Sequence, residues 1–172
     1  MRRAVSVSIL LLVAFACVAQ DASVGPSTKA ERDRAVKVTQ ELEADPLNPA
    51  FKEDRQWLLD WIKAVPDITI NVCFDPAQQK SEYRYSRELV YQKLFSSAAY
   101  IIDTSSRNRN ELSVETAGVE GALKAYQAIL KKYPTAHSPY WDRLLKKQQD
   151  GTLRDYVDSY MQTACGAQQT QA

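Results

Sequence analysis

The residues best able to do chemistry are three cysteines and a single histidine in a chain of 172 residues. Cys73 and Cys165 lie far apart and have no histidine partners at metal-site spacing, so we expect no metal ion. In an oxidising compartment an isolated cysteine pair usually forms a disulfide. Such a bond would close a loop of roughly 90 residues, for which the chain-entropy model gives a stabilisation of about 4–5 kcal/mol. The alternative is two separate buried thiols.

Acid–base and nucleophilic chemistry finds few candidates. His137 precedes a predicted helix in a turn, where we expect it to be exposed rather than catalytic. The carboxylate pairs Asp155 with Asp158 and Glu111 with Glu115 fall on predicted helices, where such charges are mostly solvated. The sequence contains no HExxH, Gly-rich phosphate loop or G-x-S-x-G pattern. We therefore expect no catalytic residues and no cofactor.

Large aromatic side chains are the remaining candidates for a functional surface. Trp57 and Trp61 are four residues apart and form one ridge on a predicted helix, for which core packing is the first interpretation. The alternative is a ligand-stacking surface, because tryptophan and tyrosine combine an apolar body with a polar edge. The candidate surface comprises Trp57, Trp61, Tyr126, Tyr133 and Trp141.

The elements that would position these residues are helices. Apolar periodicity, together with Pro, Gly and capping signals, predicts about six of them, packed as αα-hairpins in an all-α fold. Gly118, Gly121, Ala122 and Ala125 cluster on one helix flank, which would let a neighbouring helix approach closely. The predicted helices cover residues 28–44, 48–64, 86–102, 114–132, 138–150 and 152–165.

The segments between the helices are less regular. Residues 67–74 alternate apolar and polar side chains as a strand would, but without a convincing second strand they could also form an extended connector. Residues 75–82 are predicted to be a polar loop, and residues 103–113 a mobile polar loop. Cys165 lies four residues after Met161 on an apolar face, so its sulfur should point toward the core.

The N-terminus has the pattern of a secretory signal peptide. Two arginines precede thirteen uncharged residues, a run too short to cross a membrane. Cleavage after Ala19 would leave a flexible leader at 20–27, a single helical domain at 28–165 and a disordered tail at 166–172. Cleavage after Ala16 is the alternative, because the residues before Cys17 partly resemble the lipobox of bacterial lipoproteins, which implies lipidation of Cys17.

One stretch resembles part of a known repeat. Ala122, Tyr126, Leu130 and Pro134 recur at four-residue intervals, as in the second helix of a tetratricopeptide repeat. That family stacks helix pairs into a peptide-binding groove, which the resemblance would imply here. The resemblance covers about thirteen residues, and the chain has no 34-residue recurrence of the kind a repeat array shows. An ordinary amphipathic helix ended by proline also explains the pattern.

Charge and motifs together bound the function. Removing Arg2 and Arg3 lowers the basic count from 22 to 20 against 21 acidic residues, so the formal charge changes from +1 to −1. This balance gives no reason to expect nucleic acid as a partner. We expect an exported, secreted or periplasmic, non-catalytic domain that binds a protein or peptide. The alternatives are a secreted hydrolase with an unrecognised carboxylate site and a lipid-anchored structural protein of the cell envelope.

Overall fold

The computed structural model describes residues 25–71, 73–79, 82–104 and 110–166, and within these ranges it contains helices and no strand. This confirms the all-α prediction. The expected signal peptide, with Cys17, and residues 167–172 of the expected tail lie outside the described residues. The helices are α1 Lys29–Ala44, the 3-10 helix η1 Pro49–Phe51, α2 Lys52–Ala64, α3 Pro76–Gln79, α4 Ser86–Asp103, α5 Glu111–Lys132, α6 Pro139–Gln149 and α7 Leu153–Ala164.

Side-chain caps explain where several helices begin. At α1 the Thr28 hydroxyl accepts from the Glu31 amide at 3.2 Å, and the Glu31 carboxylate accepts from the Thr28 amide at 2.7 Å. The hydrogen bond from the Thr28 amide lowers the pKa of Glu31. Asn110 caps α5 by accepting from the Ser113 amide at 2.8 Å, so this helix begins at Glu111, three residues earlier than predicted.

The loop predicted at 75–82 contains a short helix that the sequence pattern did not reveal. α3 has only four residues, too few for a hydrophobic period to be visible. It begins where the Asp75 carboxylate accepts from the Ala77 amide at 2.7 Å. The prediction of a purely irregular loop at 75–82 was therefore wrong.

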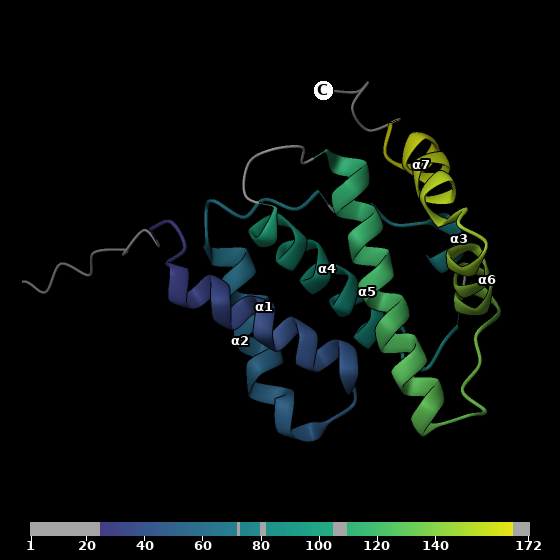
Figure 1. Cartoon of the computed structure of the whole chain (residues 1–172), viewed down its shortest axis with the longest axis horizontal. Coiled ribbons are helices and arrows are strands. Elements are labelled where there is room, and N and C mark those ends of the chain that lie inside the picture. The colour runs from purple at the N-terminus through teal and green to yellow at the C-terminus, as the bar shows by residue number, and fades with distance from the viewer. Residues whose placement is uncertain (1–24, 72, 80–81, 105–109, 167–172) are drawn as a thin grey trace, which may run out of the picture.

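The paired helices α4 and α5 lie at the centre of the molecule, with α1 and α2 on one side and α6 and α7 on the other (Figure 1). Two clusters of buried residues fill these two sides. One cluster joins α1, α2 and α4 through residues such as Leu42, Leu58 and Phe95. The other joins α5, α6 and α7 through residues such as Tyr126, Trp141 and Val157. α4 contributes buried residues to both clusters and therefore connects the two sides of the core.

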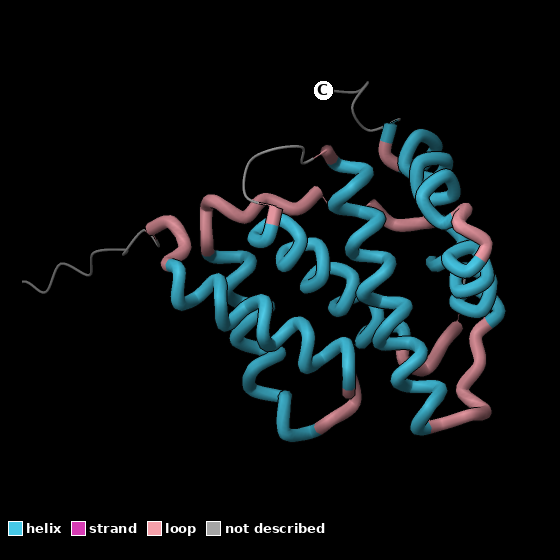
Figure 2. The backbone as a smooth tube through the Cα atoms, viewed as in Figure 1, coloured by secondary structure: helices cyan, strands magenta, loops and turns pink. Residues whose placement is uncertain are grey.

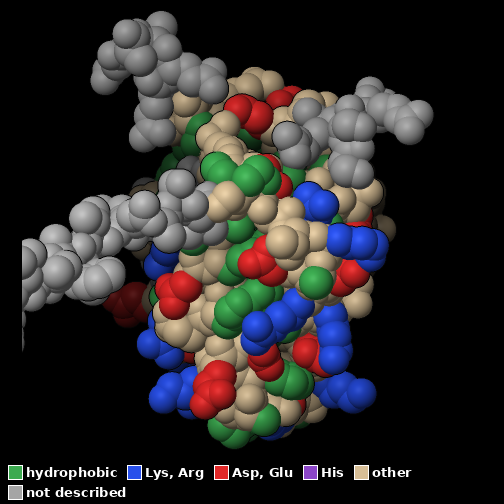
Figure 3. All heavy atoms as spheres, turned by 90° about the vertical axis from the view of Figure 1, so that its left-hand side faces the viewer, with side chains coloured by type: hydrophobic (Ala, Val, Ile, Leu, Met, Phe, Trp, Pro, Cys, Tyr) green, Lys and Arg blue, Asp and Glu red, His purple; other side chains and the backbone are tan. Residues whose placement is uncertain are grey.

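Charged side chains of both signs lie on the side of the molecule that α1 and α2 form. In Figure 3 basic and acidic side chains are interspersed there, with scattered apolar groups between them. None of the helices in the described ranges combines the length and the apolar character that crossing a bilayer requires.

Small residues set the distance between α4 and α5, as their clustering on one helix flank predicted. A Cβ atom built on Gly121 would lie 1.9 Å from the Ser96 hydroxyl oxygen. One built on Gly118 would lie 2.3 Å from the Ser97 hydroxyl oxygen and 2.8 Å from the Lys93 carbonyl oxygen. A backbone atom limits the approach at Gly118, and the short side chain of Ser96 limits it at Gly121, so glycine at both positions allows this close crossing.

Residues 65–71 and 73–75 belong to an extended connector that runs from α2 to α3 (Figure 2). Within its described residues it pairs with no strand, so the connector interpretation of residues 67–74 is correct and the strand interpretation is wrong. Val65, Ile68 and Cys73 are buried. Near its start, Asp67 accepts from the amide and hydroxyl of Ser27 at 2.8 and 2.6 Å, bonds that lower the pKa of Asp67. Residue 27, expected in the leader, therefore already contacts the helical part.

We predict that Gly118→Ala and Gly121→Ala each lower the free energy of unfolding. Alanine favours helix by about 1 kcal/mol over glycine, but overpacking costs about 1–3 kcal/mol, so the net change should be destabilising. Urea denaturation followed by circular dichroism measures it. Gly25→Ala is the control because nothing lies within 4 Å of its added Cβ. Equal stability of all three variants would contradict the close crossing.

Candidate functional site

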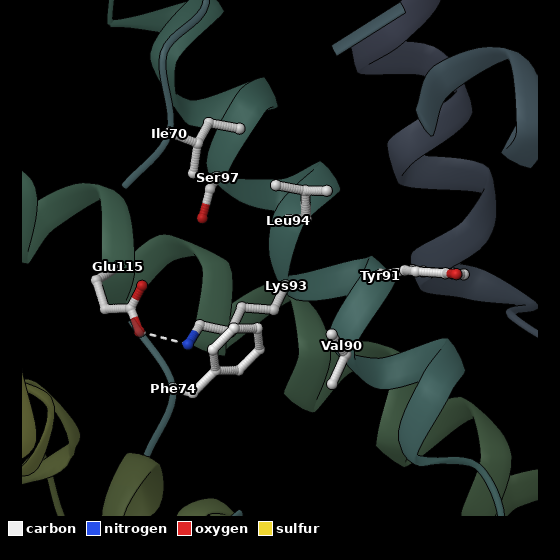
Figure 4. Close-up of a pocket in the computed structure, with 8 residues that line it drawn as sticks. All are labelled: Ile70, Phe74, Val90, Tyr91, Lys93, Leu94, Ser97 and Glu115. Atoms are coloured by element: carbon white, nitrogen blue, oxygen red, sulfur yellow. Dashed lines mark ion pairs between the residues drawn. The ribbon is translucent and has the colours of Figure 1, made fainter. Parts of the chain in front are cut away.

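A pocket opens between the extended connector, α4 and α5. Its volume is about 200 Å³, and almost all of its wall is apolar. Phe74 on the connector is 41% exposed, an unusual state for a large apolar side chain. Figure 4 shows the side chains around this space. This Lys93 pocket is lined by Ile70, Phe74, Val90, Tyr91, Lys93, Leu94, Ser97 and Glu115.

An ion pair between Lys93 of α4 and Glu115 of α5 forms the polar part of the pocket wall (Figure 4). The two side chains are only 6% and 4% exposed. The Lys93 ammonium also donates to the carbonyl oxygen of Cys73 at 2.6 Å, and the hydroxyl of Tyr160 donates to the Glu115 carboxylate. This Lys93 cluster joins the connector, α4, α5 and α7. Because buried charges require partners, each member depends on the others.

A disulfide fixes the connector to the end of α7. Cys73 and Cys165 are bonded, with their Cα atoms 6.0 Å apart. Cys73 is buried, and its carbonyl oxygen is the acceptor for Lys93. The same residue therefore links the covalent constraint to the ion pair. Since Phe74 follows directly in the chain, the pocket wall is held at this point.

A second buried carboxylate holds the next part of the chain. Asp75 accepts hydrogen bonds from the hydroxyls of Tyr140, at 3.0 Å, and Tyr156. Burial, together with Asp75, raises the pKa of Tyr156 to about 12 and also raises that of Tyr140. Burial similarly raises the pKa of Tyr160, helped by Glu115. A phenol is protonated at neutral pH even at its ordinary pKa, so the raised pKa values extend hydrogen-bond donation by these phenols into alkaline solution.

The structure corrects the expectation that both carboxylates in the 111/115 pair are solvated. Glu111 is exposed and accepts from Asn71 at 2.6 Å, whereas Glu115 is buried against Lys93. The sequence could not reveal this because the partner is a lysine on another helix. By contrast, Asp155 is exposed as expected. The exposed position predicted for His137 is also confirmed, since its side chain is 60% exposed beside Asp142.

The aromatic candidates do not form one surface. Trp61, Tyr126 and Trp141 are buried, Trp57 is partly buried, and only Tyr133 of this set is exposed, at 42%. Trp57 and Trp61 belong to one core cluster, and Tyr126 and Trp141 belong to the other, so the structure favours packing as the role of these four side chains. The exposed aromatic side chain beside the pocket is Phe74, which sequence reasoning missed because it lies on an irregular segment.

Within the described ranges, no group of three or more His, Cys, Asp or Glu side chains is placed to hold a metal ion.

Comparison with known proteins found no matching family model, and no significant match among curated proteins or solved structures.

We predict that Lys93→Met lowers the free energy of unfolding by about 3–5 kcal/mol, because it leaves the Glu115 charge buried without a partner. Glu115→Leu should act similarly. The free energy of unfolding of the double variant should fall by clearly less than the sum of the two single losses, since neither charge remains. Urea denaturation of the four proteins in a double-mutant cycle measures the coupling. Additive losses would contradict a cooperative buried pair.

Proposed function

We propose that the chain is an exported, non-catalytic domain that binds a protein or peptide by seating one apolar side chain in the Lys93 pocket. The observation that carries this proposal is an apolar cavity of about 200 Å³ beside the exposed ring of Phe74. A cavity of about 150 Å³ can hold a benzene ring. The space therefore matches a single leucine- to phenylalanine-sized side chain.

The rigidity of the pocket supports this proposal. One wall lies on α4, packed between both core clusters, and the other is held by the Cys73–Cys165 disulfide and by Lys93. A preformed site loses little conformational entropy when it binds, so a small contact area can still give measurable affinity.

Export is supported by two independent features. The basic and apolar N-terminus has the pattern of a secretory signal. The Cys73–Cys165 bond belongs to the chemistry of oxidising compartments. The hydrolase alternative gains no comparable support. Among the described residues that line the pocket, Glu115 is the one carboxylate, and its charge is already neutralised by Lys93.

We predict that N-acetylphenylalaninamide shifts the NMR signals of the Ile70 and Val90 methyl groups in a saturable manner. Val90→Trp should abolish the effect because the larger side chain fills the cavity. Gln127→Trp is the matched control, since it adds the same ring at an exposed position of α5 outside the pocket. Unchanged methyl signals at saturating ligand, or binding that survives Val90→Trp, would contradict the proposed site.

For the exported protein we predict an intact mass that begins at Gln20 and a Cys73–Cys165 bond that resists alkylation until a reductant is added. Residues 20–172 made in a reducing cytoplasm serve as control, with both thiols alkylatable. Retention of Met1, or alkylation of both thiols after export, would refute this prediction. A lipid-modified Cys17 at the N-terminus would instead establish the membrane-anchored alternative.

A further inference from the structure

The ion pair in the Lys93 pocket leaves part of its hydrogen-bonding capacity unused. A lysine ammonium has three N–H donors, and Lys93 directs two of them, one to Glu115 and one to the Cys73 carbonyl oxygen. Both partners of the Glu115 carboxylate, Lys93 and Tyr160, contact its Oε1 atom. Among the described residues none donates to Oε2. Figure 4 shows this second oxygen turned away from Lys93, on the side of Ser97 and Ile70.

The chemistry of a complementary group follows from this arrangement. It must donate to Glu115 Oε2 and accept the remaining N–H of Lys93, which a hydroxyl does with one atom. It must also be neutral, because the ion pair is already neutral and a further buried charge would lack a partner. The rest of the group must be apolar and about the size of one ring, to match the cavity of about 200 Å³.

The protein already uses this combination repeatedly in its interior. Asp75, Glu115 and the more exposed Asp142 accept hydrogen bonds from tyrosine hydroxyls whose rings are buried or partly buried. The pairs are Tyr126–Asp142, Tyr140–Asp75, Tyr156–Asp75 and Tyr160–Glu115. Asp75 accepts hydrogen bonds from two phenols, whereas Glu115 accepts from only one among the residues that the structure describes. A second phenol at Glu115 would complete the same arrangement.

We propose that the Lys93 pocket is selective for a tyrosine side chain of the partner. Its ring packs between Ile70, Val90 and Phe74, and its hydroxyl bridges Glu115 and Lys93. This inference rests on the proposed binding function and names the side chain that the pocket prefers.

The test compares ligands on the unaltered protein, because Glu115→Gln would break a buried ion pair. N-acetyltyrosinamide should bind at least about tenfold more tightly than N-acetylphenylalaninamide, the magnitude of one hydrogen bond to a charged group. The O-methyl derivative of N-acetyltyrosinamide keeps the ring and the oxygen but cannot donate. Its affinity should fall to that of the phenylalanine ligand or below. NMR titration of the pocket methyl groups gives the dissociation constants, with Val90→Trp as the blocked control.

The outcomes separate the two proposals. Equal affinity for the tyrosine and phenylalanine ligands would overturn tyrosine selectivity and leave the apolar binding site intact. Absence of binding by either ligand would overturn both. If p-cresol binds tightly in the pocket while N-acetyltyrosinamide does not, the occupant is a free phenol, and a tyrosine of a partner protein is excluded.

Discussion

The buried ion pair between Lys93 and Glu115 is the interaction on which the rest of the structure depends. Lys93 comes from α4, the helix shared by both core clusters, and Glu115 comes from its partner α5. Through the Cys73 carbonyl and the Tyr160 hydroxyl, the same pair reaches the connector and α7. Two desolvated charges are stable only when they are mutually paired and hydrogen-bonded. This requirement fixes the connector, α4, α5 and α7 relative to one another.

The close crossing of α4 and α5 and the buried pair are two parts of one arrangement. Gly118 lies against the Lys93 carbonyl oxygen, so the two helices approach each other closely at the point where the Lys93 side chain extends from α4. A wider spacing would admit water to the pair and weaken its attraction. The disulfide then adds a covalent constraint at Cys73, the residue whose carbonyl the lysine holds. These constraints also determine the shape of the Lys93 pocket, because its walls are formed by the connector, α4 and α5.

Local physics made much of the helical architecture predictable. The side-chain caps at Thr28 and Asn48, and the prolines in the first turns of η1 and α6, are read directly from residue type. The pairing of Cys73 with Cys165 followed from counting cysteines and asking which compartment the chain reaches. The candidate site was not predictable, because it combines Phe74 on an irregular connector with a lysine and a glutamate on separate helices.

The sequence by itself determined the helical periods, the glycine flank that permits a tight crossing, and the cysteine pair that stabilises the connector. These depend on neighbours within a few residues or on composition alone. Only the tertiary structure decided which charges are buried. Glu111 and Glu115 look alike in the sequence, yet one faces solvent and the other faces Lys93. Burial depends on how helices distant in the chain pack together, and that packing turned a helix-surface carboxylate into the polar wall of a pocket.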